Sequence, residues 1–341
     1  MLGPRDDRDV THMPEPDASE TVVKIAEGYM DSRCLHVVAS LGVCDVVTDE
    51  PRNLPYIAGQ LGVDAEALGR VIRHLASLGV FDISEGNVRH NEASRLLRRD
   101  DPGGLLPLTR MLGLPIIWDS FKTLEDAVKT GRPGATFHDP NGFFAYLDAH
   151  REESEVYDKG MTAMTTRRIA RVVPAYDFSE FKVIADIGGG RGHLLQAVLE
   201  QAPGARGVLF DRAAVADGLG SSDRISVQVG SFFTDPLPAA DCYLLSNVIH
   251  DWSDPDAVAI LTAVRAAAAP GSTLLLFEFV IPEDAGQFEA SDIDVYMLAL
   301  VGGRERTLDE YGRLLDAAGW QLQRTVRTPS QDIVEAVPAH S

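Results

Sequence analysis

Residues 183–193 read Val183-Ile184-Ala185-Asp186-Ile187-Gly188-Gly189-Gly190-Arg191-Gly192-His193, and a second apolar run, Gly207-Val208-Leu209-Phe210-Asp211, follows after a helical pattern. A short apolar run that ends in glycines is typical of a buried parallel strand entering a tight turn, because glycine lets the backbone turn and a ligand approach closely. The stretch therefore predicts the strand–turn–helix–strand half of a nucleotide-binding fold. In such a fold Asp211 is placed to accept hydrogen bonds from ribose hydroxyls.

The glycine spacing discriminates between two classes of cofactor. A dinucleotide-binding loop reads Gly-x-Gly-x-x-Gly, and its third glycine lets the helix pack closely on the strand. Here His193 stands at the place of that third glycine, after Gly188, Gly190 and Gly192. A nicotinamide-dependent dehydrogenase is therefore the weaker alternative, and a cofactor-binding assay separates the two.

Composition limits the possible partners. The chain has 341 residues, which suggests two domains, and a formal net charge of −20 at pH 7. Because so acidic a protein repels phosphate backbones and anionic membranes, we expect neither nucleic acid nor a membrane as partner. Cys34, Cys44 and Cys242 lack metal-ligand spacing and cannot all pair, which favours reduced thiols and a cytoplasmic location. No apolar run approaches the roughly 18 residues needed to span a bilayer.

The pattern along the chain predicts four segments. Residues 1–20 are polar and contain proline, so we expect a disordered tail. Residues 21–104 have the order helix, turn, helix, hairpin of a winged-helix-like domain. Residues 105–175 are helical and rich in aromatic residues, some of which we expect to line a substrate pocket. Residues 176–341 alternate strand and helix, which predicts an α/β domain with a parallel sheet, helices on both faces and an antiparallel edge.

The winged-helix pattern admits a second class of function. Its second helix carries Arg70, Arg73 and His74, which could contact phosphates in a ligand-sensing DNA-binding regulator. The acidic charge of the chain and the lack of a larger basic cluster argue against this hypothesis. The apolar helices that precede the pattern favour a dimerisation module instead.

Three residues are candidates for acid–base chemistry. His250 follows an apolar strand, where ligands bind in open α/β sheets, and its side chain suits a general base near neutral pH. Glu278 ends a buried strand, so its carboxylate needs a partner, and His250 from a neighbouring strand can provide it. Glu305 lies in a loop rich in glycine and arginine. Two carboxylates beside the histidine would orient it, fix its tautomer and make it more basic.

Several stretches together resemble the S-adenosylmethionine-dependent O-methyltransferase family that includes plant caffeic acid and acetylserotonin enzymes and many bacterial natural-product tailoring enzymes. They are the glycine loop, Asp211, Gly230-Ser231-Phe232-Phe233, His250-Asp251-Trp252-Ser253-Asp254 and Gly302-Gly303-Arg304-Glu305-Arg306-Thr307. The resemblance implies a Rossmann-like class I methyltransferase domain, with an N-terminal winged-helix dimerisation domain that forms a homodimer.

The resemblance also implies a reaction. A methyl group passes from S-adenosylmethionine to a hydroxyl of an aromatic or polyketide-like small molecule, in secondary-metabolite or antibiotic biosynthesis. The product of the cofactor is S-adenosylhomocysteine, and no metal is expected. A nitrogen acceptor, or a divergent member that holds the cofactor without transferring methyl, are alternatives within the family.

The family pattern further implies roles for individual residues. His250 matches the family's general base, and Glu278 and Glu305 match the acids that flank it. The expected cofactor-binding residues are Asp186, Gly188, Gly190, Asp211, Arg212, Ser231, Phe232 and Ser246. The candidates for the acceptor pocket are Trp118, Phe143, Met161, Asn247, Asp294 and Met297, of which Met161 and Met297 match positions that clamp the acceptor ring.

Two positions depart from the family pattern. Ser231 stands where the family usually has an aspartate that accepts a hydrogen bond from the adenine amino group. A serine hydroxyl, a backbone carbonyl or the ring of Phe232 would have to replace that contact. Arg212-Ala213-Ala214 follows Asp211 where the family often has Leu-Pro, but Asp211 itself is retained.

Overall fold

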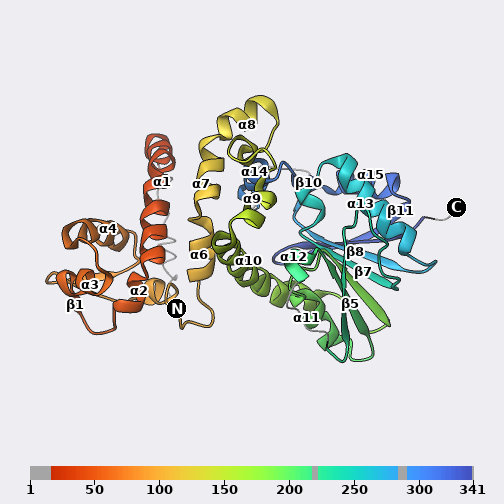
Figure 1. The fold of residues 1–341 in the computed structure, drawn as a ribbon, viewed down its shortest axis with the longest axis horizontal. Coiled ribbons are helices and arrows are strands. Elements are labelled where there is room, and N and C mark those ends of the chain that lie inside the picture. Colours follow the sequence, from red (N-terminus) through yellow and green to blue (C-terminus); the bar gives the residue numbers. More distant parts are fainter. Residues whose placement is uncertain (1–16, 217–221, 283–289, 340–341) are drawn as a thin grey trace, which may run out of the picture. The chain divides into compact units, whose positions relative to one another are not determined.

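The computed structural model describes residues 17–216, 222–282 and 290–339, which belong to two compact units, Met1–Thr109 and Arg110–Ser341 (Figure 1). Each unit has its own hydrophobic core. Among the described residues no helix is long and apolar enough to cross a membrane. Most of the predicted tail lies outside the described residues.

The first unit is mainly helical and ends in a small sheet. Its strands are hydrogen-bonded in the order β1-β3-β2. Its core collects the inward faces of the helices, with Ile57, Ile72 and Leu75 almost completely buried. The elements are α1 (Ala18–Leu41), α2 (Val43–Val46), β1 (Arg52–Asn53), α3 (Leu54–Leu61), α4 (Ala65–Ser77), β2 (Asp82–Ser84), β3 (Asn87–Arg89) and α5 (Glu92–Arg95).

Local sequence signals decide where these helices and strands begin and end. Asp64 caps α4 by accepting a hydrogen bond from the backbone N–H of Ala67 at 2.8 Å, as its position predicts. The hairpin between β2 and β3 turns at Glu85 and Gly86, both in the left-handed region. Helix α1 begins earlier than expected, at Ala18, because the carboxylate of Asp17 accepts from the N–H of Ser19. The predicted tail is therefore wrong over its last three residues.

A helical segment opens the second unit and continues the chain from the first. All of its regular elements are helices, as predicted for residues 105–175, and Gly131, with φ 70°, ends its third helix. The elements are α6 (Leu106–Leu112), which spans the boundary between the units, α7 (Pro115–Lys122), α8 (Leu124–Thr130), η1 (Gly134–Phe137), α9 (Phe143–Ala149), α10 (Arg151–Val172) and η2 (Val173–Ala175).

The remainder of the second unit alternates strands and helices, as its apolar pattern predicts. Helix α13 begins after Ser253, whose hydroxyl accepts from the N–H of Asp256, as expected for an N-cap. The elements are β4 (Val183–Ile187), α11 (His193–Gln201), β5 (Arg206–Asp211), α12 (Ala213–Ala216), β6 (Ile225–Val229), β7 (Cys242–Ser246), η3 (Ile249–Asp251), α13 (Asp254–Ala267), β8 (Thr273–Glu278), β9 (Val280–Ile281), α14 (Ser291–Leu300), β10 (Arg306–Thr307), α15 (Leu308–Ala317), β11 (Trp320–Val326) and β12 (Asp332–Pro338).

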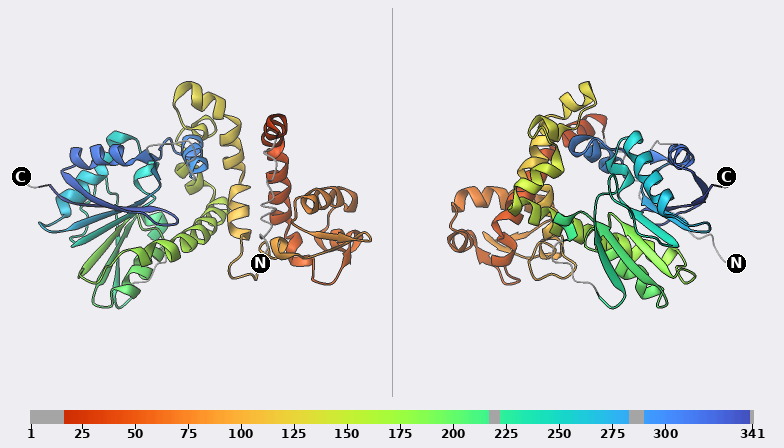
Figure 2. Two further views of the ribbon diagram at one scale, coloured as in Figure 1. Left: turned by 180° about the vertical axis from the view of Figure 1, so that it is seen from behind. Right: turned by 45° about the vertical axis from the view of Figure 1, so that its right-hand side comes forward.

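Seven strands form one sheet in the order β11-β12-β8-β7-β4-β5-β6. Strands β4 to β8 are parallel, whereas β12 runs antiparallel to both β8 and β11, which confirms the predicted antiparallel edge. Figure 2 shows helices on both faces of this sheet, with α11 against one face and α13 and α15 against the other. This arrangement confirms the expected Rossmann-like α/β fold.

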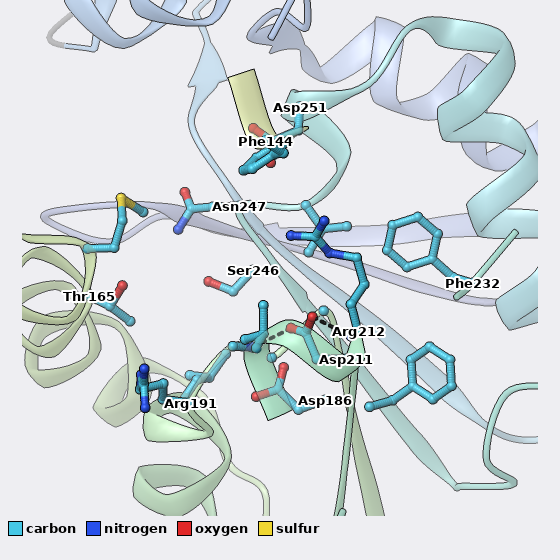
Figure 3. Close-up of a pocket in the computed structure, with 18 of the residues that line it drawn as sticks. Phe144, Thr165, Asp186, Arg191, Asp211, Arg212, Phe232, Ser246, Asn247 and Asp251 are labelled. Atoms are coloured by element: carbon cyan, nitrogen blue, oxygen red, sulfur yellow. Dashed lines mark hydrogen bonds between the residues drawn. The ribbon is translucent and has the colours of Figure 1, made fainter. Parts of the chain in front are cut away.

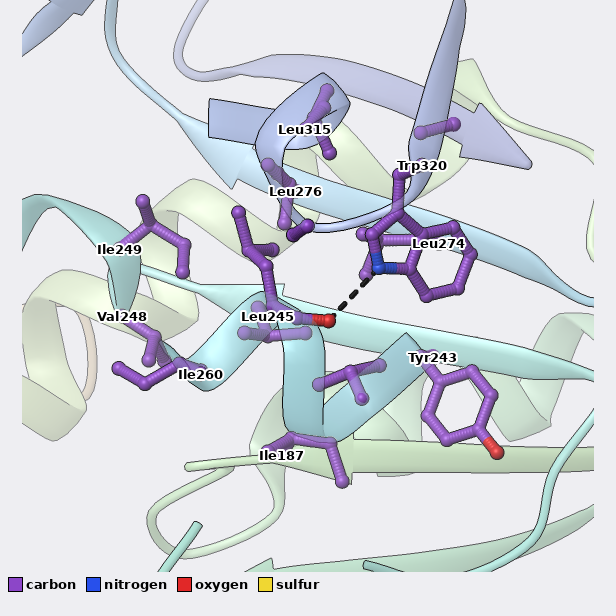
Figure 4. Packing of buried hydrophobic residues seen from close by; sticks show 14 of the residues in the cluster. Ile187, Tyr243, Leu245, Val248, Ile249, Ile260, Leu274, Leu276, Leu315 and Trp320 are labelled. Atoms are coloured by element: carbon purple, nitrogen blue, oxygen red, sulfur yellow. Dashed lines mark hydrogen bonds between the residues drawn. The ribbon is translucent and has the colours of Figure 1, made fainter. Parts of the chain in front are cut away.

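The core on the α13 side holds the strand ends in place. Trp320, Leu245 and Leu276 are fully buried there, and the indole N–H of Trp320 donates to the carbonyl of Leu261 at 2.9 Å (Figure 4). The same cluster includes Val248 and Ile249, which follow β7 immediately. Because burial of these two side chains anchors the turn after β7, the next residue, His250, has a fixed position.

Candidate active site

A cavity of about 350 Å³ opens at the carboxyl ends of β4, β5, β6 and β7 (Figure 3). This is the edge where open α/β sheets bind ligands. All of the residues predicted to bind a cofactor line it: Asp186, Gly188, Gly190, Asp211, Arg212, Ser231, Phe232 and Ser246.

The turn after β4 shapes the floor of this cavity. Gly188 and Gly190 have φ of 70° and 60°, which favour glycine, and the N–H of Gly188 donates to the carbonyl of Phe210 at 2.8 Å. The carboxylate of Asp211 accepts from the N–H groups of Gly190 at 2.8 Å and Arg212 at 2.6 Å. These bonds tie the end of β5 to the glycine turn and hold the carboxylate at the cavity wall.

Two carboxylates close together make this wall unusual. Burial and, to a smaller extent, the charge of Asp211 together raise the pKa of Asp186 to about 7. Oδ2 of Asp186 is buried and has no hydrogen-bond partner among the described residues. Such an atom is costly unless a ligand or a proton satisfies it. The cavity is therefore suited to a ligand that presents donors to this wall.

Aromatic rings form the opposite side. Phe232 packs edge-on against Phe233 and Trp252, with ring centroids 4.8 and 5.7 Å apart. Ser231 is committed to the turn: its N–H donates to Asp235 at 2.8 Å, and its hydroxyl accepts from the N–H of Phe233 at 3.3 Å. The ring of Phe232 is thus the better-placed group for a flat heterocycle.

His250 lies in the short helix η3, beside the cavity. Its side chain is 6% exposed, and its Nδ1 is 2.7 Å from Oε1 of Glu305 and 3.7 Å from Oε2 of Glu278. Oε1 of Glu278 accepts from the backbone N–H groups of Val248 and Ile249. The structure therefore brings the three predicted acid–base residues together in one buried cluster.

The neighbouring charges decide the protonation of His250. Burial alone would lower the pKa of its imidazole, but the charge of Glu278 and the hydrogen bond with Glu305 outweigh burial and raise the pKa to about 9. Burial raises the pKa of Glu278, and the histidine charge opposes that effect. Because Nδ1 must donate to a carboxylate, Nε2 is the nitrogen that exchanges protons, and it lies 3.5 Å from Oδ1 of Asp251.

The same three side chains place their donor atoms within 4.8 Å of one another, as a metal site would. Their spacing suits a proton better. Ligand atoms about 2.1 Å from a tetrahedral Zn²⁺ lie roughly 3.4 Å apart, whereas Nδ1 of His250 and Oε1 of Glu305 are at hydrogen-bond distance, 2.7 Å. Backbone N–H groups also occupy one oxygen of Glu278.

The predicted acceptor-pocket residues are dispersed. Met161 and Asn247 line the cavity, and the amide oxygen of Asn247 accepts from Gln331. Trp118 on α7 and the buried Met297 on α14 do not line it.

Phe143 and Asp294 each contact residues of the cavity or of the His250 cluster. Phe143 is buried and packs edge-on against Phe144 and Tyr157, both of which line the cavity. The carboxylate of Asp294 accepts from the backbone N–H of Glu305 at 2.8 Å, so it orients the residue that contacts His250.

Several residues that line the cavity were not predicted from the sequence. Asp158, Thr162 and Thr165 form one face of α10 together with the predicted Met161, and the i, i+3, i+4, i+7 spacing of these four residues was a usable signal. From the sequence, Asp251 was expected only as part of the stretch from His250 to Asp254, with no role of its own in the site. It lines the cavity, and burial raises its pKa to about 6 despite the charge of His250.

Two families of known proteins match this chain, and together they cover most of it. The O-methyltransferase domain family matches residues 121–321, and the O-methyltransferase dimerisation domain family matches residues 23–100. A phenazine O-methyltransferase of Lysobacter antibioticus is 35% identical over 94% of this chain and 96% of its own. A mitomycin biosynthesis 6-O-methyltransferase of Streptomyces lavendulae is 34% identical over 91% of each chain.

A solved structure shows the same fold with ligands. It is an O-methyltransferase from neocarzinostatin biosynthesis in complex with S-adenosylmethionine and 2-hydroxy-5-methyl naphthoic acid. It is 31% identical, has a TM-score of 0.79, and the match covers 91% of this chain and 96% of that one.

Proposed function

Because this chain belongs to the O-methyltransferase family, we propose that it transfers a methyl group from S-adenosylmethionine to a hydroxyl of an aromatic or polyketide-like small molecule, with His250 as the general base. The observation that carries the proposal is the pairing of one cavity, lined by all of the predicted cofactor residues, with a histidine held between two buried carboxylates.

The cavity residues fit the proposed cofactor. The carboxylate of Asp211 ends β5 where a ribose would be bound, and the unpartnered Oδ2 of Asp186 awaits a donor. The ring of Phe232 offers a face on which the adenine can stack. This stacking replaces the hydrogen bond that the family's aspartate makes with adenine and that Ser231 cannot make. When bound, the cofactor supplies a methyl group already activated by a sulfonium.

The protein then has to position the acceptor and remove its proton. Nε2 of His250 takes the hydroxyl proton, while Nδ1 donates to Glu305 and keeps the ring in one tautomer. The positive charge that forms is stabilised by Glu278, Glu305 and Asp251, which surround the ring. Bringing donor and acceptor into line supplies several kcal/mol, and base assistance adds about 10²–10⁴-fold.

The acceptor class follows from the relatives and from the cavity wall. One named relative is a phenazine O-methyltransferase, another acts in mitomycin biosynthesis, and the solved structure holds 2-hydroxy-5-methyl naphthoic acid. Here Phe144, Met161 and Trp252 give the cavity aromatic and soft apolar surfaces that suit a flat ring system. We therefore propose that the enzyme methylates an intermediate or product of natural-product biosynthesis.

The test is a methyl-transfer screen. Purified protein is incubated with isotopically labelled S-adenosylmethionine and a panel of hydroxynaphthoates, hydroxyphenazines and other phenols, each paired with its arylamine analogue. We expect a methylated phenol and an equal amount of S-adenosylhomocysteine. Methylation of the arylamines alone would replace the hydroxyl acceptor by a nitrogen acceptor, and binding without transfer to any compound would reject the reaction.

We also propose a homodimer built on the first unit, and a cytoplasmic location. The dimerisation-domain match covers residues 23–100, and α1 exposes Val22, Ile25 and Tyr29, which are 62–76% accessible. Such a row of apolar side chains is unfavourable in water unless it is covered. The free cysteines Cys34, Cys44 and Cys242 suit a reducing compartment.

A further inference from the structure

Arg306 in β10 is a completely buried arginine with no part in the proton transfer described above. Its Nη1 donates to the carbonyl of Ile249 at 3.0 Å, and its Nη2 donates to the carbonyl of Trp252 at 2.7 Å. Nε and Nη2 also donate to one carboxylate oxygen of Asp254, at 3.0 and 2.8 Å. A buried guanidinium is costly unless its donors are satisfied, and here each of its three nitrogens has a partner.

The carbonyls that Arg306 contacts lie on both sides of His250. Ile249 immediately precedes His250, and Trp252 follows it by two residues. The guanidinium therefore bridges the backbone on both sides of His250. A third bond joins the same segments, because the N–H of Arg304 donates to the carbonyl of His250 itself at 2.9 Å. The backbone of the turn is thus held at three carbonyls by two residues of one segment.

Gly303 shows how closely the two segments approach. A Cβ at this position would lie 1.8 Å from the carbonyl oxygen of His250 and 2.6 Å from the carbonyl carbon of Asp251. Only glycine leaves room for this contact. The segment of residues 303–306 therefore packs directly on the His250 turn, and it also carries Glu305, whose carboxylate accepts from Nδ1 of the histidine.

We propose that Arg306 is a positioning residue for methyl transfer: its guanidinium holds the backbone of the His250 turn in register with Glu305, so that the imidazole keeps both its orientation and its carboxylate partner. This inference rests on the proposed function of His250. It extends that function, because the segment that supplies the acid also sets the position of the base.

Only the planar guanidinium of an arginine can make all of these contacts. Two carbonyls that flank His250 and one carboxylate are reached at once by a planar group with donors in fixed directions. The ammonium of a lysine has the charge but cannot span all three. A displacement of about 1 Å at a reacting group costs on the order of 100-fold in rate. Loosening the turn should therefore reduce turnover while leaving the cofactor cavity largely intact.

The test compares Arg306→Met and Arg306→Lys with the wild-type enzyme, using the acceptor found by the methyl-transfer screen. For Arg306→Met we expect kcat to fall by about 10–100-fold, with acceptor KM and the Kd of S-adenosylhomocysteine changed far less. Arg306→Lys should recover part of the rate. If Arg306→Met does not fold, Arg306→Lys alone is compared with the wild-type enzyme. An unchanged kcat in that variant would then overturn the positioning role.

Arg265→Met is the matched control. Nε of Arg265 also donates to a backbone carbonyl, that of Gly319, at 2.9 Å, and its guanidinium packs over Trp320, away from His250. We expect this variant to lose stability but to retain the wild-type kcat. An equal fall in kcat for Arg265→Met and Arg306→Met, or an unchanged kcat in Arg306→Met, would overturn the positioning role.

A second readout does not depend on any acceptor. The ring resonances of His250, assigned among the nine histidines by their loss in His250→Gln, report its pKa by NMR titration. The ring is faced by Glu278 from β8, Glu305 from the segment before β10, and Asp251 from η3. We expect the pKa to fall in Arg306→Lys, which keeps the positive charge near the turn, as the Glu305 contact loosens, and an unchanged pKa would contradict the inference. Wild-type protein that transfers no methyl would reject the proposed function without affecting this titration.

Discussion

Nδ1 of His250 lies 2.7 Å from Oε1 of Glu305, although 55 positions separate the two residues in the chain. The first follows a central strand of the sheet, and the second precedes β10. Their contact is short because Asp294 accepts from the N–H of Glu305 on one side, and Glu278 holds the N–H groups of Val248 and Ile249 on the other. The base is therefore assembled by four separate segments.

Replacing His250 by glutamine tests the base directly. The amide keeps a polar side chain of similar size but cannot accept and carry a proton. We expect kcat to fall by about 10²–10⁴-fold, while calorimetry gives a Kd for S-adenosylhomocysteine within about twofold of wild type, since the cavity contacts lie on other residues. A variant with full turnover at neutral pH would exclude His250 as the base.

The pH dependence follows from the charges around His250. Because its pKa is raised to about 9, the unprotonated form that can act as a base is the minor species at pH 7. We expect kcat/KM to rise about tenfold per pH unit below this value and to level above it. An initial-rate profile from pH 6 to 10 measures this, and a profile already flat at pH 7 would contradict it.

Glu278→Gln should move that profile to lower pH. Glu278 carries the largest charge effect that raises the pKa of His250, and glutamine removes the charge while it can still accept from Val248 and Ile249. The pKa of His250 should fall, so kcat/KM should level at lower pH. The matching change at a distant carboxylate, Glu335→Gln, which pairs with Arg324, should leave the profile unchanged.

Phe232→Ala should weaken cofactor binding. If adenine stacks on this ring, its loss costs about 1–3 kcal/mol, the usual value for stacking of a base on an aromatic side chain. Isothermal titration with S-adenosylhomocysteine would then show a Kd roughly 5–150-fold higher. Phe121→Ala is the control, because Phe121 packs against Tyr296 outside the cavity. Equal effects in both variants would show that the loss is general destabilisation.

Ile25→Glu should disrupt the proposed dimer. Ile25 is 76% exposed on α1, so a charge costs little in the monomer but is unfavourable in a buried interface. Sedimentation velocity of wild type and variant should show a shift from dimer to monomer. Ile83→Glu places the same charge on an exposed apolar residue of the hairpin and should leave the dimer intact. A wild-type protein that sediments as a monomer would reject the proposal.

Local signals in the sequence determined most of the fold. The apolar run before Gly188 predicts β4, and Ser253 predicts the start of α13, because buried strands and N-caps are specified by residues next to each other. The set of cofactor residues was also predictable, since each lies at or just beyond the carboxyl end of a parallel strand, and these ends share one edge of the sheet.

Tertiary structure alone decided how the base is held and what surrounds it. Asp294, which the sequence predicts to contact the acceptor, accepts from the N–H of Glu305, a bond that no sequence pattern indicates. Helix α10 lines the cavity with one face, although it lies far from most of the strands in the chain. Arg306 likewise donates hydrogen bonds to the carbonyls beside His250, in a segment far from its own. Sequence by itself determined which side chains end the strands, because that depends on neighbours along the chain. The partners of those side chains depend on how the helices and the sheet pack, and only the folded chain settles that.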